Sequence, residues 1–448
     1  MARKFTWLQA TTIAGAIALA PVATAAMAAS DGDSYREIDR FMEVFNRVKA
    51  SYVDKVDDKK LIRGAIDGML NSLDPHSSYM DAVDFQNMKI LTDGNYGGLG
   101  LSVTMQDGAV KVIAPQEDTP AWRAGIKAGD FITHIDGQLI FGETLDEAIS
   151  SMRGKPGTKI SLTLVRPGRD KPIEVSIIRE TIVQKPVKWE VRDGIGYINI
   201  NTFSENTGAD VRAAIAGIDK QLGHKPLGYI VDLRDNGGGL LSQAIEVSDA
   251  FLSYGEIVSQ RGREKTDIER YYAKPGDLTG GLPIIVLSNA GTASASEIVA
   301  GALQDHHRAL IMGERSFGKG SVQTLLQLDE ESALRLTTAR YFTPSGRSVQ
   351  EGGIRPDIAV PQISDPDFKT RPVFREADLR RHLVNEVKAD NAILEEDTKP
   401  DPRFAMTPDQ LKKKGVEDFQ LWYALQTIAR LARAAPPAMT ASTGPKKR

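Results

Sequence analysis

Hydrophobic and polar residues follow different periods along the chain, and the first clear period is that of a helix. From residue 34 to 72, apolar side chains recur every three or four positions, on one helical face. These side chains are Phe41, Val44, Phe45, Val48, Tyr52, Leu61, Ile62, Ala65, Ile66 and Met69. The segment LDPH at 73–76 then breaks the pattern. We therefore expect a small helical region over residues 30–85.

Residues 86–180 change to short, strand-like segments that open on a cluster of glycines. Asp136-Gly137 stands between two such segments, 131–135 and 138–140, and this is a strong signal for a hairpin turn. A helix-like stretch over 145–152 precedes one more strand. Strands with one or two short helices in about 95 residues predict a compact, independent module.

Between about residues 190 and 360, apolar strand-like runs alternate with helix-like stretches. The expected strands and helices, in chain order, cover residues 197–200, 211–222, 228–233, 240–252, 283–287 and 294–303. This alternation predicts an α/β fold with partly parallel strand pairing. We assign this core domain to residues 181–362.

The two ends of the chain differ from the rest. Residues 363–448 are polar and helical in patches, at 374–387 and 410–431, and their Pro-, Ala-, Ser-, Thr- and Lys-containing end is expected to be disordered. Residues 1–29 resemble a signal peptide, with a basic start, an apolar run over 11–22 and Ala26-Met27-Ala28 as a cleavage site. An uncleaved membrane anchor is the alternative, although the run is short for a span of about 20 residues. We expect export, to the bacterial periplasm or the outer face of a membrane.

Composition excludes several classes of protein. A chain of 448 residues suggests roughly three domains, and 41% hydrophobic with 26% charged residues is an ordinary globular balance. The formal net charge of -3 argues against a nucleic-acid binder. The absence of cysteine removes disulfides, cysteine-ligated zinc and thiol nucleophiles. The six histidines lack ligand spacing, so we expect neither a structural metal nor a cofactor.

Ser294 is the first candidate for chemistry. It follows the apolar strand 284–287 and a glycine-containing bend, and an apolar helix begins after it. The free N–H groups and the positive dipole end of a helix N-terminus favour a developing negative charge, which suits a nucleophile beside an oxyanion hole. Ser294 and Glu297 also have the spacing of a capping box. A structural role is therefore the alternative, and both roles can hold together.

A serine nucleophile needs a base, and Lys319 is a better candidate than His306 or His307. His306 and His307 lie at the far end of the helix that follows Ser294, about 18 Å away by helical rise. Lys319 stands between two glycines, where a solvating lysine would gain nothing. To act as a base it must be neutral, so burial would have to lower its pKa by about 3 units. An anion-binding loop is the other option.

Gln323 could orient the lysine only if the chain bends. In a straight strand it would lie about 13 Å from Lys319, too far for contact. A partnership of the two residues therefore requires a bend at Gly320. Without that bend, Gln323 is an ordinary strand residue.

Two glycine clusters offer backbone N–H groups. The cluster at 236–239 closes one strand and opens the helix from Leu240, which makes it a candidate for a second oxyanion donor. A phosphate loop or a plain turn is the alternative, but the cluster lacks the ending of a P-loop and the spacing of a dinucleotide site. The other cluster is Gly98-Leu99-Gly100-Leu101, which precedes a strand. Such a turn can bind a peptide carboxylate while the sheet edge pairs with the peptide backbone.

Several long motifs in order make the chain resemble the carboxy-terminal processing proteases, also called tail-specific proteases, over roughly residues 36 to 360. The motifs are LDPHSSYM at 73–80, GGLGL at 97–101, AGIKAGDFITHIDG at 124–137, DLRDNGGGLL at 232–241, NAGTASASEI at 289–298, GERSFGKGSVQ at 313–323 and YFTPSGRSVQEGGIRPD at 341–357. The resemblance implies a PDZ domain inserted before an α/β protease core of the crotonase and Clp type.

The resemblance also implies the catalytic set. Ser294 would attack the scissile carbonyl, Lys319 would accept and then donate the proton, and Gln323 would hold the lysine. The N–H groups of Gly238 and Ala295 would form the oxyanion hole. This chain has Gly237 where the family commonly has proline, which loosens that turn.

The partners implied by the resemblance are protein substrates, recognised by their C-terminal tails through the PDZ domain. Some relatives process envelope proteins with an adaptor protein. We also expect a homo-oligomer formed through apolar faces of the N- and C-terminal helices. A non-catalytic periplasmic protein that binds tails through the PDZ domain is the alternative function, and a crotonase-like acyl-CoA enzyme is a weaker one because coenzyme A is cytoplasmic.

Overall fold

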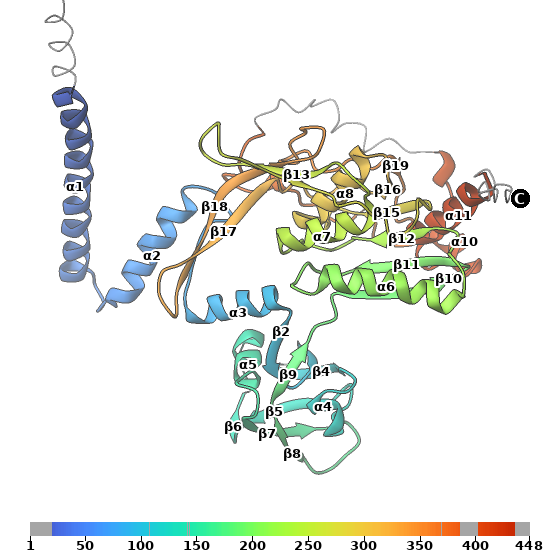
Figure 1. The fold of residues 1–448 in the computed structure, drawn as a ribbon. Helices are drawn as coiled ribbons and strands as arrows, with labels where there is room; N and C mark the ends of the chain where they lie inside the picture. Colours follow the sequence, from blue (N-terminus) through green and yellow to red (C-terminus); the bar gives the residue numbers. More distant parts are fainter. Residues whose placement is uncertain are drawn as a thin grey trace, which may run out of the picture. The chain divides into compact units, whose positions relative to one another are not determined.

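The computed structural model describes residues 20–434 except for 107, 141, 143, 369 and 386–401. Residues 1–19 of the predicted signal peptide (1–29) and the predicted disordered tail after residue 434 lie outside these described residues, whereas residues 20–29, with the predicted cleavage site, are helical. The chain divides between Ser72 and Leu73 into two compact units, and Figure 1 labels the helices and strands of each.

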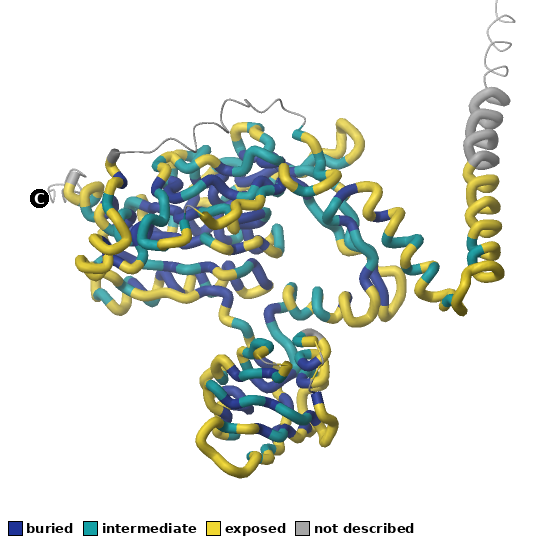
Figure 2. Tube along the Cα trace, turned by 180° about the vertical axis from the view of Figure 1, so that it is seen from behind, coloured by how far each residue is buried: buried dark blue, intermediate teal, exposed yellow. Residues whose placement is uncertain are grey.

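The described part of the first unit consists of two helices, α1 (Ala20–Ser51) and α2 (Asp58–Asn71). The helical prediction over 34–72 is confirmed, although α1 begins earlier than predicted. Asp57 caps α2 by accepting the N–H of Lys60 at 3.0 Å. Much of the described apolar surface of α1 is exposed, shown in yellow in Figure 2. Its exposed large side chains are Tyr35, Ile38, Phe41, Met42 and Val44. In the part of the chain that the structure describes, no helix is both long and apolar enough to cross a membrane.

The second unit contains helix α3 (Ala82–Asp93), which is followed by a β-rich module that has its own core. The strands of its main sheet are β3 (Leu101–Gln106), β4 (Ala109–Pro115), β5 (Phe131–Ile135), β6 (Gln138–Leu139), β7 (Lys159–Val165) and β8 (Ile173–Ile178). Helices α4 (Pro120–Arg123) and α5 (Leu145–Met152) accompany this sheet.

The turn chemistry of this module follows the sequence. Strands β5 and β6 pair through Asp136 and Gly137, whose φ angles of 48° and 79° suit a type I′ hairpin. At the two ends of the module, β2 (Asn95–Gly98) pairs antiparallel with β9 (Glu180–Val183). The predicted hairpin is thus confirmed.

A six-stranded sheet forms the centre of the remaining chain. In sheet order its strands are β10 (Val187–Arg192), β11 (Ile195–Ile200), β12 (Tyr229–Asp232), β15 (Ile284–Ser288), β16 (Leu310–Gly313) and β19 (Ile358–Ala359). Only β10 is antiparallel to its neighbour. The predicted α/β class with partly parallel pairing is confirmed.

Both faces of this sheet are covered, which explains why its strands read as continuous apolar runs. On one face lie α6 (Thr207–Leu222), α7 (Leu241–Phe251) and α8 (Ala295–Asp305). Val231 and Val286 belong to the core on that face, whereas Ile230 and Ile285 belong to the core on the other. Because successive side chains of a strand point to opposite faces of the sheet, the same strands contribute to two hydrophobic cores, one on each face.

A second sheet carries the segments next to the candidate site. Its strands are β1 (Ser78–Met80), β13 (Glu256–Arg261), β14 (Ile268–Tyr272), β17 (Ser321–Gln327) and β18 (Ala333–Phe342). Both β1 and β17 pair antiparallel with β18. The segment at 73–80 and the strand that follows Lys319 are thereby attached to one strand.

The C-terminal region is less helical and more buried than predicted. Over 374–385 only a 3₁₀ turn, η1 (Glu376–Asp378), forms, so the predicted helix at 374–387 is wrong over its described part. Beyond it lie η2 (Pro402–Phe404), α10 (Pro408–Lys413) and α11 (Phe419–Ala434). The apolar side of α11 packs against the central sheet, so the expectation that this helix exposes an apolar face for oligomerisation is wrong.

We predict that Ile428→Ala lowers the free energy of unfolding by about 2–5 kcal/mol, because a fully buried side chain between α11 and the sheet is removed. Ile428 fills the space left by the missing Cβ of Gly228. Urea unfolding followed by circular dichroism measures the change. Leu431→Ala, on the same helix but at a side chain that is 37% exposed, is the control and should cost below about 1 kcal/mol. Equal losses in both variants would contradict the packing of α11.

Candidate active site

Ser294 lies where the chain enters α8, one turn after β15. Its φ is 56° and its ψ is -116°, a conformation that costs a non-glycine residue about 1–3 kcal/mol. The approach to it is fixed by hydrogen bonds. The hydroxyl of Thr292 donates to the carbonyl of Leu233 at 2.8 Å, and the N–H of Ala293 donates to the carbonyl of Asn236 at 2.9 Å. Hydrogen bonds to the loop that follows β12 therefore maintain the strained conformation of Ser294.

The carboxylate of Glu297 connects Ser294 with the loop that carries Lys319. Its Oε2 accepts the N–H of Ser294 at 2.8 Å and the N–H of Lys319 at 2.9 Å. The two backbone nitrogens therefore lie at most 5.7 Å apart, the sum of these two distances. Its Oε1 accepts the N–H of Gly318 at 2.8 Å and the hydroxyl of Ser316 at 2.5 Å. One side chain thus brings the backbones of the two predicted residues together.

Glu297 is completely buried in this position. Burial raises the pKa of its carboxyl group to about 7, although the donors from Ser316, Ser294, Gly318 and Lys319 favour the charged form. The group that joins the two segments is therefore itself titratable near neutral pH.

Tyr341 joins the same two residues through their carbonyl groups. Its hydroxyl oxygen lies 3.2 Å from the carbonyl oxygen of Ser294 and within hydrogen-bonding distance of that of Lys319. Burial raises the pKa of Tyr341 well above its ordinary value, which keeps the phenol neutral and able to donate. Glu297 thus accepts the backbone N–H groups of both Ser294 and Lys319, and the hydroxyl of Tyr341 lies beside the carbonyl oxygens of both.

The environment of Lys319 favours the neutral amine. Burial lowers the pKa of its side chain, and the positive charge of Arg335 acts in the same direction. The carboxylates of Glu376, Glu297 and Asp74 act in the opposite direction. The net shift is downward, the direction that a lysine base requires.

The glycines that flank Lys319 serve close packing. A Cβ at Gly318, where φ is 98°, would lie 2.8 Å from a carbonyl oxygen, and one at Gly320 would lie 2.6 Å from the backbone nitrogen of Gln350. The N–H of Gly318 donates to Glu297, and that of Gly320 donates to the side-chain oxygen of Gln350 at 2.9 Å. Since the N–H groups of residues 318–320 all donate to side chains of the protein, they are not available for an anion.

Gln323 lies in β17 immediately after an irregularity in its pairing with β18. Its Nε2 donates to the hydroxyls of Ser321 at 3.0 Å and Thr337 at 3.2 Å. The amide is therefore fixed by two hydroxyl groups. Its predicted contact with the amine of Lys319 stays a prediction.

Gly238 and Ala295, the predicted oxyanion donors, lie side by side. A Cβ at Gly238, where φ is 100°, would lie 2.9 Å from the nitrogen of Ala295, so only glycine fits this approach. The N–H of Gly238 already donates to Oδ1 of Asn236 at 2.8 Å. Ala295 is the first residue of α8, where backbone N–H groups lack an intrahelical acceptor. In this state Ala295 is better suited than Gly238 to stabilise an anion.

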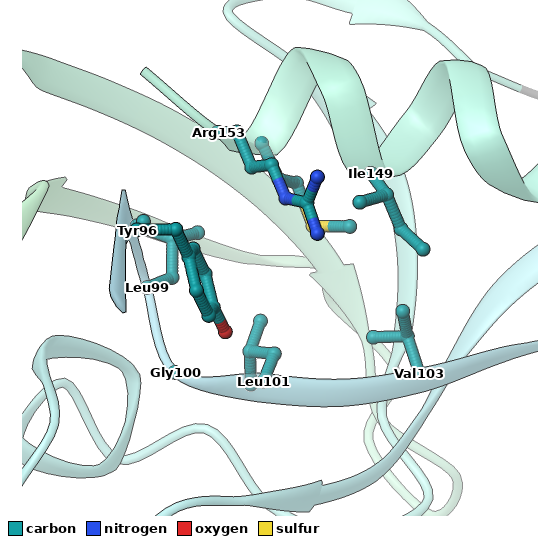
Figure 3. Close-up of a pocket in the computed structure, with 9 residues that line it drawn as sticks. Tyr96, Leu99, Gly100, Leu101, Val103, Ile149 and Arg153 are labelled. Atoms are coloured by element: carbon teal, nitrogen blue, oxygen red, sulfur yellow. The ribbon is translucent and has the colours of Figure 1, made fainter. Parts of the chain in front are cut away.

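The four residues predicted to bind a peptide tail, Gly98 to Leu101, all line one cavity of about 150 Å³. Its other lining residues are Tyr96, Val103, Ile149, Met152 and Arg153. Figure 3 shows the guanidinium of Arg153 extending between Tyr96 and Ile149. An apolar cavity bordered by a cation and a glycine turn can accommodate an apolar side chain next to a carboxylate.

Models of three known families match the chain. Peptidase family S41 matches residues 194–360, the N-terminal domain of the activating protease CtpB matches residues 4–83, and the PDZ domain matches residues 111–166. The two central assignments agree with the positions of the α/β core and of the β-rich module.

Individual relatives extend over most of the chain. It is 53% identical over 363 residues to a carboxy-terminal-processing protease of Bartonella bacilliformis, covering 81% of this chain and 84% of that protein. It is 38% identical over 353 residues to the carboxy-terminal processing protease CtpA of Bacillus subtilis, covering 77% and 72%. Among solved structures, the photosystem II D1 C-terminal processing protease matches with 29% identity and a TM-score of 0.42, covering 71% and 92%.

Two residues of the site were missed by sequence reasoning. Glu297 was interpreted only as a helix cap, because its spacing from Ser294 gives no indication of the second loop that it binds. Tyr341 is the first residue of the motif YFTPSGRS, and nothing in its local pattern indicates contact with residues 22 and 47 positions earlier.

We predict that Glu297 makes stability depend on pH. From its usual pKa of 4.5 up to about 7, the folded protein retains a proton that the unfolded chain has lost, so stability from this group is lost as pH rises through that range. The expected loss is about 3 kcal/mol. It is measured as the difference in free energy of unfolding between wild type and Glu297→Gln from pH 4.5 to 8. Glu174→Gln, at an exposed position, is the control, and a difference that stays constant for Glu297→Gln would contradict the prediction.

Proposed function

This chain belongs to the carboxy-terminal processing proteases of peptidase family S41, and we propose that it cuts peptide bonds with Ser294 as the nucleophile and Lys319 as the general base. The serine-type peptidase activity and the PDZ domain follow from the family. The roles of individual residues are the proposed part. The observation that carries them is the single carboxylate oxygen that accepts N–H groups from both Ser294 and Lys319.

In the proposed reaction, the hydroxyl of Ser294 attacks the scissile carbonyl while the neutral amine of Lys319 takes the hydroxyl proton. The protonated lysine then gives that proton to the leaving amine, and an acyl-enzyme remains. Water next attacks the ester and loses a proton to Lys319, which returns that proton to the oxygen of Ser294 as the carboxylic acid product leaves. Gln323 would hold the lysine once its amide carbonyl reaches the amine.

The oxyanion of each tetrahedral intermediate needs donors aimed at it. The N–H of Ala295, at the positive end of α8, is suited to this task. The N–H of Gly238 can join only after it leaves Oδ1 of Asn236. We therefore propose that substrate binding reorients the turn at 236–239 before acylation.

Substrates are proposed to be proteins captured by their C-terminal tails in the PDZ domain. The cavity beside Leu99 and Leu101 suits an apolar last side chain, and the glycine turn can donate N–H groups to the terminal carboxylate. An envelope adaptor protein that presents substrates would act before this capture, and a pull-down that recovers only substrates would argue against it.

Processing or degradation of cell-envelope proteins in the periplasm is proposed from the signal-peptide pattern of residues 1–29. Cell fractionation with mass spectrometry of the mature N-terminus tests this location. A full-length protein in the cytoplasmic fraction would refute it.

We predict that Ser294→Ala and Lys319→Ala each lower kcat/KM by at least about 10³-fold on an unstructured protein with an apolar tail, since each removes one half of the reacting pair. Lys188→Ala, at an exposed position of β10, is the control and should behave as wild type. The same substrate with a charged tail should be cut more slowly by the wild type. Equal activity of wild type and Ser294→Ala would end the proposal, and tail binding without any turnover would favour the non-catalytic alternative.

We predict that the exposed face of α1 forms the contact of a homo-oligomer, because large apolar side chains are costly to leave in water. Light scattering at micromolar concentration should give a mass above that of one chain for wild type. A double replacement, Phe41→Asp with Val44→Asp, should lower that mass. A wild-type monomer would refute this assembly.

A further inference from the structure

The loop that carries Lys319 is bound by a segment that follows the protease core in sequence. Nη1 of Arg375 donates to the carbonyls of Arg315 and Ser316 at 2.9 and 2.7 Å. The N–H of Glu376 donates to the carbonyl of Phe317 at 3.1 Å. Three successive carbonyls of the loop are therefore held by two successive residues, although sequence reasoning assigned residues 363–448 to a separate helical region.

The side chain of Glu376 extends this contact to the residue after Lys319. Its Oε1 accepts Nε2 of Gln350 at 3.0 Å, and Oε1 of Gln350 accepts the N–H of Gly320 at 2.9 Å. Both side chains belong to fully buried residues. A carboxylate can only accept, so it forces the NH₂ end of the buried amide toward itself and the C=O end toward Gly320. Glu376 thereby determines which way Gln350 points.

A third group approaches Glu376 from the motif at 73–80. Nε2 of His76 lies 2.9 Å from both carboxylate oxygens of Glu376. His76 is positioned by its own loop, because the carboxylate of Asp74 accepts the backbone N–H of His76 at 2.8 Å. Nε of Arg335 also holds this residue, donating to the carbonyl of His76 at 3.0 Å.

These contacts form one continuous path from His76 through Glu376 and Gln350 to the backbone next to Lys319. A buried carboxylate is costly to desolvate, and a hydrophobic side chain would fill the same space at lower cost. Glu376 contacts the loop that carries the proposed base Lys319, so its buried carboxylate can hold that loop in place.

We infer that Glu376 is a positioning residue for the proposed base Lys319, and that the His76–Glu376 pair couples the segment at 73–80 to the loop at 315–320. This inference rests on the proposed function, since it assigns the loop its role as carrier of the base. The pair would transmit a displacement of the 73–80 segment to the lysine through one hydrogen-bonded side chain.

The charges around Lys319 give the inference a specific signature. Arg335 favours the neutral amine, whereas Glu376, Glu297 and Asp74 favour the protonated one. Loss of the Glu376 charge would lower the pKa of Lys319 further, so the acidic limb of kcat/KM against pH would move to lower pH. A variant that was merely misfolded would lose activity at every pH without moving this limb.

The test compares Glu376→Gln with wild type. We expect kcat to fall about tenfold with KM within about twofold, because a displaced base affects the reaction more than binding. We also expect the acidic limb to move to lower pH. The control is Glu190→Gln, which removes an exposed ion pair of β10, Glu190 with Arg192 at 2.6 Å, and should leave kcat and the acidic limb unchanged. A Glu376→Gln variant with wild-type kcat and an unshifted limb would overturn the inference.

The coupling is tested by His76→Gln and by the double variant. If His76 acts through Glu376, the double variant should be no slower than Glu376→Gln alone, whereas multiplied losses would refute the pair. Hydrogen exchange provides a readout that does not need catalysis. Peptides covering 315–320 should exchange faster in Glu376→Gln and not in Glu190→Gln, and equal protection in wild type and Glu376→Gln would count against positioning. An inactive wild type would refute the proposed function. The exchange comparison would then still test whether Glu376 positions the loop at 315–320.

Discussion

The geometry of the candidate site depends on one buried carboxyl group, which accepts backbone N–H groups from the start of α8 and from the loop that carries Lys319. Glu297 binds Ser294 on its own helix and Gly318 and Lys319 on a loop more than twenty residues later. At a fully buried position, a carboxyl group that accepts several N–H donors holds them in a fixed arrangement. The relative position of Ser294 and Lys319, the proposed nucleophile and base, is therefore set by hydrogen bonds to their backbones.

When Glu297 is charged, it disfavours the neutral form of Lys319 that the proposed mechanism requires. Its negative charge raises the pKa of Lys319, as do the charges of Glu376 and Asp74, whereas a base must be neutral. Burial and the charge of Arg335 outweigh these three carboxylates. The candidate site thus combines backbone positioning by buried carboxyl groups with desolvation of the lysine amine.

Elements whose pattern is local were predictable. The apolar strands 228–233 and 283–287, the hairpin at Asp136-Gly137 and the helix that starts after Ser294 all form where their residues indicated. The helix over 374–387 was wrong over its described part, because Arg375 and Glu376 make hydrogen bonds to a distant loop in place of a helical ladder. The apolar face of α11 was visible in sequence, but not that the central sheet covers it.

By itself, the sequence determined the order of the motifs, the period of each segment and the residue types available for chemistry. These properties depend on neighbours along the chain, which a pattern can record. Only the tertiary structure decided that Glu297 and Tyr341 hold Ser294 beside Lys319, that Gly238 donates to Asn236, and that Glu376 is linked through Gln350 to Gly320. Those facts arise from hydrogen bonds across folded segments, and their partners are chosen by how sheets and loops pack, which no local period encodes.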